Sequence, residues 1–190
     1  QAAASKEGAE VLAAQQNSAL RLQFLGDYFE KRPELRKEIG AKAEQGRRQF
    51  NEVADAWYNL NSKNASLSES QRSSILDEAL EMGRTDPSLP LNALVDMFSL
   101  YAKKSGEQDA NRIQNVLQQT ITEAGGSGED VANYMPRFLP IGISGGLTPA
   151  QSAGLWAYAT TQESEASIAT TGIKAIMLAL QGKGTPESQE

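Results

Sequence analysis

Carboxylates are the residues of this chain with the widest chemical use. The 190-residue sequence contains no histidine and no cysteine. This composition excludes a Ser-His-Asp triad, a cysteine nucleophile, disulfide bonds and thiolate metal sites. A single glutamate can still protonate a glycosidic oxygen where an apolar pocket raises its pKa. Glu163, in the run Gln162-Glu163-Ser164, is the candidate for this role.

The surroundings of Glu163 loosely resemble those in lytic transglycosylases, which cleave peptidoglycan. In that family a Glu-Ser pair opens the site and a segment of the form GAxGLMQ follows. The corresponding segment here runs from Gly172 to Gln181, with Ala175 in place of the second glycine, and leaves no room for the family's downstream loops before Glu190. We therefore interpret Glu163 as a favourable partner of a helix start and predict that the chain is not an enzyme.

Two further groups of residues resemble binding sites but have simpler interpretations. Asp77, Glu78 and Glu81 have the spacing of a weak metal cluster, yet no histidine or calcium-type loop accompanies them, so we predict a solvated helix face. The glycine-rich stretch at 142–146 has no lysine after it and no strand before it, which favours an elbow over a phosphate loop. The sequence thus predicts no cofactor and no metal.

The charge pattern restricts the partners. The chain has 18 basic and 24 acidic residues, a net charge of −6. Its richest basic cluster, at 31–37, is interleaved with glutamates. Duplex DNA and RNA require concentrated positive charge, so we predict no direct nucleic-acid binding. No apolar run approaches the roughly 20 residues that a membrane helix needs, which predicts no stable membrane span.

The elements that position these residues are predicted to be helices. Hydrophobic residues make up 39% of the chain and never alternate in strand-like runs. We expect an all-α protein with about eight helices, in which a long N-terminal antiparallel hairpin precedes a compact bundle. The hairpin consists of helices at 5–31 and 33–61. Its second helix has an apolar residue every three or four positions, at Ile39, Ala43, Gly46, Phe50, Val53, Trp57 and Leu60.

The predicted divisions follow from breaks in this pattern. The hairpin occupies residues 1–64, the bundle 65–182, and a tail or linker 183–190. Capping residues open helices at Ser68, Ser127 and Thr148. Pro136 and Pro140 are expected to kink or shorten the helix that follows Ser127. A weak self-similarity at an offset of 57 residues, which places Tyr101 on Tyr158, suggests a repeated two-helix unit.

Five residues near the C-terminus are the candidates for assembly. Gly145 and Gly146 form the elbow. Trp156, Ile173 and Ile176 are the packing anchors on the two helices that follow it. The last helix, at 164–180, is apolar nearly all round, which is typical of a helix at the centre of a bundle or paired with another chain.

Residues 134–180 resemble the core region of tailed-bacteriophage tail tape measure proteins. That region has an acidic helix start, an apolar Leu-Pro segment, a helix opening of the GLT-x-x-Q type and a closing helix of small residues. This chain has Leu139-Pro140-Ile141-Gly142, then Gly146-Leu147-Thr148-Pro149-Ala150-Gln151, and closes with Glu165-Ala166-Ser167-Ile168-Ala169-Thr170.

The resemblance implies a structural virion protein that sets tail length and lies inside the tail tube. It implies residence in the virion tail, and in the host cytoplasm during assembly, with tail tube and tail tip proteins and other copies of itself as partners. Family members are usually much longer than 190 residues, so we expect a fragment that acts as a self-association or docking module. A helical adaptor, or a secreted or periplasmic binding module, is the alternative.

Overall fold

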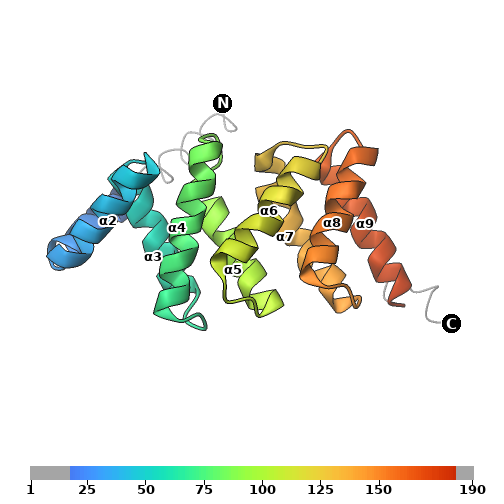
Figure 1. Cartoon of the computed structure of the whole chain (residues 1–190), viewed down its shortest axis with the longest axis horizontal. Coiled ribbons are helices and arrows are strands. Elements are labelled where there is room, and N and C mark those ends of the chain that lie inside the picture. Colours follow the sequence, from blue (N-terminus) through green and yellow to red (C-terminus); the bar gives the residue numbers. More distant parts are fainter. Residues whose placement is uncertain (1–17, 183–190) are drawn as a thin grey trace, which may run out of the picture. The chain divides into compact units, whose positions relative to one another are not determined.

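The computed structural model describes residues 18–182, and every regular element in this range is an α-helix (Figure 1). Residues 18–30 are helical. Eight helices follow: α2 (Pro33–Gly46), α3 (Phe50–Lys63), α4 (Glu69–Thr85), α5 (Leu91–Ser105), α6 (Ala110–Glu123), α7 (Gly128–Ser144), α8 (Pro149–Gln162) and α9 (Ala166–Leu180). The predicted all-α class is confirmed. The start of the first predicted helix, at 5–17, and the predicted tail at 183–190 lie outside the described residues.

The chain forms two compact units, Gln1–Asp55 and Ala56–Glu190. The boundary falls within α3. The division predicted from the sequence lies after residue 64, just beyond the end of α3. That division stays a prediction.

The first unit contains a break that the sequence pattern did not indicate. A continuous helix over 33–61 was expected, and that prediction is wrong because α2 ends at Gly46. Arg47 adopts a left-handed conformation with φ 53°. The N–H groups of Arg47 and Arg48 donate to the carbonyls of Glu44 and Ala43, a Schellman arrangement that closes the helix.

The residues that this pattern placed in the core are nevertheless mostly buried. Ile39, Ala43 and Val53 are almost fully covered. The helix at 18–30 packs on the start of α3, where the rings of Phe29 and Phe50 meet edge to face with centroids 5.6 Å apart. The pattern therefore identified the buried face, although it missed the turn that divides the helix. The predicted long hairpin is not confirmed.

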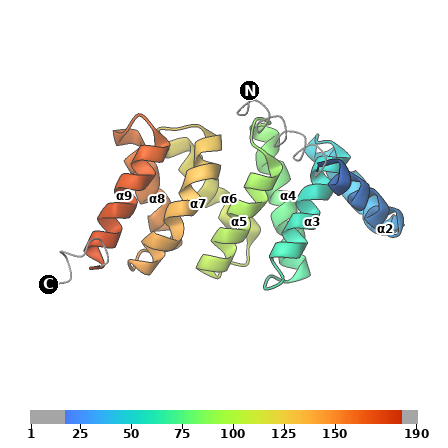
Figure 2. The same cartoon turned by 180° about the vertical axis from the view of Figure 1, so that it is seen from behind.

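The second unit arranges its helices in two layers. Helices α4, α6 and α8 pack on one another in sequence and form the layer at the front of Figure 1. Helices α5, α7 and α9 form the other layer, which is at the front of Figure 2. Consecutive helices belong to different layers, so each helix pair packs on the pair before it. This stacking of pairs is the construction principle of helical repeat proteins.

The starts of the helices reveal the repeat length. In the first layer, helices begin at Glu69, Ala110 and Pro149, about 40 residues apart, a spacing found in two-helix repeats. The predicted two-helix unit therefore has a counterpart in the fold. The offset of 57 suggested by the sequence has the wrong register, because it places α5 of one layer on α8 of the other.

The predicted helix starts are confirmed. Ser68, Ser127 and Thr148 each accept a hydrogen bond from the backbone three residues later, and the side chain at that later position accepts from the capping residue's backbone N–H. Of the two expected effects of Pro136 and Pro140, a shortened helix is contradicted, whereas a kink stays a prediction. Helix α7 continues through Pro136 and Pro140 because it packs on α5, α8 and α9, and this tertiary packing outweighs the lost backbone hydrogen bonds.

Candidate interaction surface

The predicted elbow connects α7 to α8. Gly142 is still helical, so the connection is shorter than the predicted 142–146. Gly145 caps α7, and Gly146 has φ +92°, a conformation that L-residues rarely adopt. The N–H of Leu147 then donates to the carbonyl of Gly142 at 3.1 Å. The elbow thus requires glycine at 146 for its backbone conformation.

Two of these glycines also permit close packing. A Cβ atom on Gly142 would lie 2.5 Å from the Oγ of Ser152, and one on Gly145 would collide with the end of Met177. Helix α7 therefore approaches α8 at Gly142 and α9 at Gly145. The Ser152 hydroxyl is buried at the first of these contacts and has no hydrogen-bond partner in the described part of the chain.

Helices α8 and α9 are joined by a buried polar contact. Trp156 is fully buried, and its indole Nε1–H donates to the Oγ1 of Thr170 at 2.8 Å. The Thr170 hydroxyl in turn donates to the carbonyl of Ala166 at 2.6 Å. Ile173, one turn further along α9, is 8% exposed. Trp156 and Ile173 therefore lie at the joint between the two helices. Thr170 is on the same buried side of α9, one turn before Ile173, and sequence analysis did not identify it.

Ile176 does not lie in this core. The sequence pattern predicted Ile176 as a packing anchor of the last helix, but its side chain is 60% exposed, so its placement among the packed residues of this chain is wrong. The inward face is instead made by Ala169, Thr170, Ile173 and Met177. The Trp156–Thr170 hydrogen bond and the seating of Met177 over Gly145 fix the rotation of α9, and this rotation turns Ile176 outward.

The outer side of α9 is an exposed surface without charge. We define the α9 face as the exposed residues that follow one side of this helix: Ile168, Thr171, Gly172, Ala175, Ile176 and Ala179. Lys174 is the only charged residue between Ala166 and Leu180, and it is not part of this face. Surface helices normally carry charged residues on their outer side, so the α9 face is the strongest candidate for an interaction surface.

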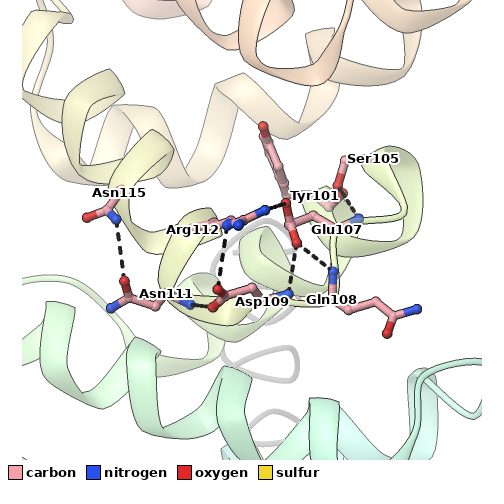
Figure 3. A network of polar contacts seen from close by, with 8 residues as sticks. All are labelled: Tyr101, Ser105, Glu107, Gln108, Asp109, Asn111, Arg112 and Asn115. Carbon is pink, nitrogen blue, oxygen red and sulfur yellow. Dashed lines mark hydrogen bonds and ion pairs between the residues drawn. The ribbon is translucent and has the colours of Figure 1, made fainter.

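A polar cluster surrounds the connection between α5 and α6 (Figure 3). The Glu107 carboxylate accepts hydrogen bonds from the backbone N–H groups of Gln108 and Asp109, both at 3.0 Å. Asp109 caps α6 by accepting from the N–H of Asn111. The Arg112 guanidinium lies 3.8 Å from Glu107 and 3.6 Å from Asp109. Each carboxylate thus has partners within the cluster. These contacts hold the turn between α5 and α6.

The same cluster borders a small cavity of about 250 Å³. Tyr101 and Arg112 line it, together with Ser105, Gly106, Glu107 and Val116. Burial, with a smaller contribution from the Glu107 charge, raises the pKa of the Tyr101 phenol. A phenol with an ordinary pKa is already protonated near neutral pH, so this shift does not change the charge of Tyr101 there. Since the one arginine at the cavity is already paired with two carboxylates, the cluster stabilises the turn between α5 and α6.

Glu163 has none of the surroundings that a catalytic acid requires. It is exposed just after the last residue of α8, at the end of this helix and not at a helix start. Its carboxylate accepts hydrogen bonds from the N–H and the hydroxyl of Ser164, at 2.9 and 3.1 Å. An acid of the glycosidase type needs an apolar pocket around the carboxyl group. The local geometry is that of a turn residue.

The acidic residues of α4 form a helix face. Asp77 and Glu81 are exposed and Glu78 is half-buried. Among residues 18–182, no group of three or more acidic side chains is arranged to hold a metal ion. Burial is the main cause that raises the pKa of Glu78; the nearby acidic residues add to it, and a hydrogen bond with Asn111 opposes it. These residues therefore provide surface charge.

Comparisons with protein-family models, with curated proteins and with solved structures gave no significant match. The resemblance of residues 134–180 to tape measure proteins thus stays a prediction. Within the described part of the chain, no helix has the length and apolarity that crossing a membrane requires.

Proposed function

We propose that this chain is a structural component that works by helix-to-helix assembly, as a piece of a phage tail tape measure protein. The observation that carries the proposal is the α9 face, where Ile168 and Ile176 are 51% and 60% exposed on a helix side that has no charge. Apolar side chains grouped in this way are typical of surfaces that become covered on association.

The construction of the second unit supports this proposal. Proteins built from stacked helix pairs offer long surfaces for other proteins. The outer side of α9 is one such surface, because it is exposed and has no charged residue. The tape measure resemblance covers residues 134–180, which span most of α7 and all of α8 and α9, so it coincides with the helices that produce the exposed face.

The net charge of −6 is compatible with a tail-lumen protein. Such a protein coexists with DNA without holding it, and an acidic surface reduces attraction to phosphate groups. The tail tube and tail tip proteins, together with other copies of the chain, are the proposed partners. The virion tail is the proposed location.

Molar mass and shape in solution test this proposal. We expect light scattering, over a concentration series, to give a mass above that of the 20.5 kDa monomer, and small-angle scattering on the same samples to give a defined oligomer. A particle that remains monomeric at every concentration would contradict self-assembly and favour an adaptor that binds a foreign helix. Release of soluble fragments from peptidoglycan would instead favour the enzymatic alternative with Glu163.

A further inference from the structure

We infer that the α9 face binds the α9 face of a second copy of this chain, with the two helices antiparallel about a two-fold axis. This inference rests on the proposed function, since it names the partner of the same surface. Three observations carry it: the register of the helix pairs, the distribution of charge along the layer, and the sizes of the residues on the face.

The register shows that α9 has the residues of a covered helix. When α5, α7 and α9 are aligned from their first residues, the same four positions are apolar in all three helices. These positions are Leu94, Val131 and Ala169; Phe98, Met135 and Ile173; Tyr101, Phe138 and Ile176; and Ala102, Leu139 and Met177. All are buried except Ile176. Tyr101 and Phe138 occupy the equivalent position in helices that are followed by another pair, so Ile176 corresponds to a position that the next helices of the stack cover.

The charges show that α9 differs from its neighbours on the solvent side. At each position equivalent to Thr171, Ala175 and Ala179, one of the two neighbouring helices has an exposed charged residue: Asp96 and Lys104 in α5, and Arg137 in α7. The other helix has Asn133, Leu100 or Ile141 there. Helix α9 has no charge at any of these positions. Two copies of a chain with net charge −6 repel one another, and an uncharged face is where they can meet without placing like charges together.

The residue sizes favour an antiparallel pair. If Gly172 lies opposite Ala175 of the second copy, then Ile168 lies opposite Ala179 and Ile176 lies opposite Thr171. Each isoleucine thus meets a smaller residue, and Gly172 and Ala175 lie at the centre, where the helix backbones come closest. An antiparallel pair also places each helix dipole against an opposed one. In a two-fold arrangement, both copies use the same surface for the contact.

The expected dimer is weak. Helix α9 has 15 residues, so the contact is about 22 Å long at about 1.5 Å per residue. Contacts of this size fall at the low end of specific interfaces, which predicts a reversible association that depends on concentration.

Single cysteines test the geometry, because the chain has none of its own. We expect Ala175→Cys to form a disulfide-linked dimer under mild oxidation, since in the antiparallel pair the two copies of this position are offset by only about 4.5 Å along the helix. Ala41→Cys, on the exposed side of α2, is the matched control and should remain monomeric on denaturing gels.

A second pair of variants distinguishes antiparallel from parallel pairing. The two copies of Ala179 are about 16 Å apart along the helix in the antiparallel arrangement, so Ala179→Cys should not cross-link to itself. An equimolar mixture of Ala179→Cys and Ile168→Cys should cross-link to a heterodimer. Self-linkage of Ala179→Cys as efficient as that of Ala175→Cys would overturn the antiparallel geometry.

A charge placed on the face tests the surface itself. Ala175→Glu should weaken the dimer at least tenfold by light scattering, because two buried carboxylates would face each other near the axis. Ile176→Glu is the second variant, and Ala41→Glu is the control that should leave the dimer unchanged. Circular dichroism should show equal helix content in all three, since each position is exposed. Oligomers that persist in both α9 variants would overturn the inference but leave the proposed function standing, whereas a monomeric parent chain would overturn both.

Discussion

At the scale of single residues, Thr170 provides a hydrogen-bond acceptor that its apolar neighbours cannot provide. It accepts the indole hydrogen bond of Trp156, and both residues are buried. A buried donor that loses its acceptor keeps its desolvation cost without compensation. The joint between α8 and α9 therefore depends on one hydroxyl group as well as on apolar contact.

Thr170→Val should lower the free energy of unfolding by about 1–3 kcal/mol, because it leaves the Trp156 N–H unpaired while it keeps the volume of the side chain. Urea unfolding, followed by tryptophan fluorescence and circular dichroism, measures this loss. Thr122→Val is the control, because Thr122 lies outside the α9 face. Thr122 also donates to a carbonyl four residues earlier, at 2.9 Å, but it is exposed, so the change should stay within about 0.5 kcal/mol. Equal losses for the two variants would show that the indole hydrogen bond contributes nothing particular.

Glu78 gives stability a dependence on pH. Burial raises its folded-state pKa above the ordinary value of 4.5. Folding is therefore favoured by the protonated carboxyl group. This contribution is complete below the unfolded-state pKa and is lost as the pH rises through the folded-state pKa. Glu78→Gln should raise the melting temperature slightly at pH 7, and the gain should disappear as the pH falls below 4.5. Glu38→Gln, at an exposed position of α2, should show a smaller change; a gain for Glu78→Gln that persists at low pH would contradict the burial argument.

At the scale of elements, the elbow decides how α7 is followed by α8. Gly146 has φ +92° and open space around the position of a Cβ atom, so the conformation of the backbone is what excludes other residues. The Thr148 capping box then starts α8 directly after the turn. A substitution that changes the backbone conformation of Gly146 would therefore change the angle at which α8 and α9 pack on α7.

Gly146→Val should destabilise the C-terminal helices by about 1–3 kcal/mol, because a β-branched residue is strained at positive φ. The residues of the first unit should keep their helix content. Thermal unfolding by circular dichroism and proteolysis between α7 and α8 measure the effect. Gly154→Ala is the matched control: this glycine is in α8 with free space around it, and alanine there should be neutral or stabilising by about 0.5–1 kcal/mol. A Gly146→Val variant that melts like the parent chain would refute the requirement for glycine.

The helix starts could be predicted from the sequence, whereas one helix end and the orientation of one helix could not. Capping residues at Ser68, Ser127 and Thr148 predicted three helix starts correctly, because caps act through bonds to residues only three positions away. The break at Arg47 had no such local signal, since it is an arginine that adopts the left-handed conformation usually taken by glycine. The outward position of Ile176 depends on a hydrogen bond between two helices. Contacts of this kind arise from packing, so periodicity along one helix does not contain them.

At the scale of the second unit, stability should differ between the middle and the end of the stack. Helix α7 packs on α5, α8 and α9, whereas α9 packs on α7 and α8 and exposes its outer face. In stacked helix pairs, protection against local unfolding comes from the neighbours on either side. The inferred partner of α9 would supply a neighbour that residues 18–182 do not provide for this helix.

Hydrogen exchange at two protein concentrations separates these contributions. At low concentration, the amide groups of α9 should exchange faster than those of α7, because local opening of α9 uncovers less apolar surface. At high concentration, protection of α9 should rise, since the dimer must dissociate before the helix opens, whereas α7 should change little. In Ala175→Glu, the exchange of α9 should remain fast at both concentrations. If the protection of α9 does not depend on concentration in the parent chain, then the outer face of α9 is not covered by a second copy in solution, and the exposed Ile168 and Ile176 must meet a different partner.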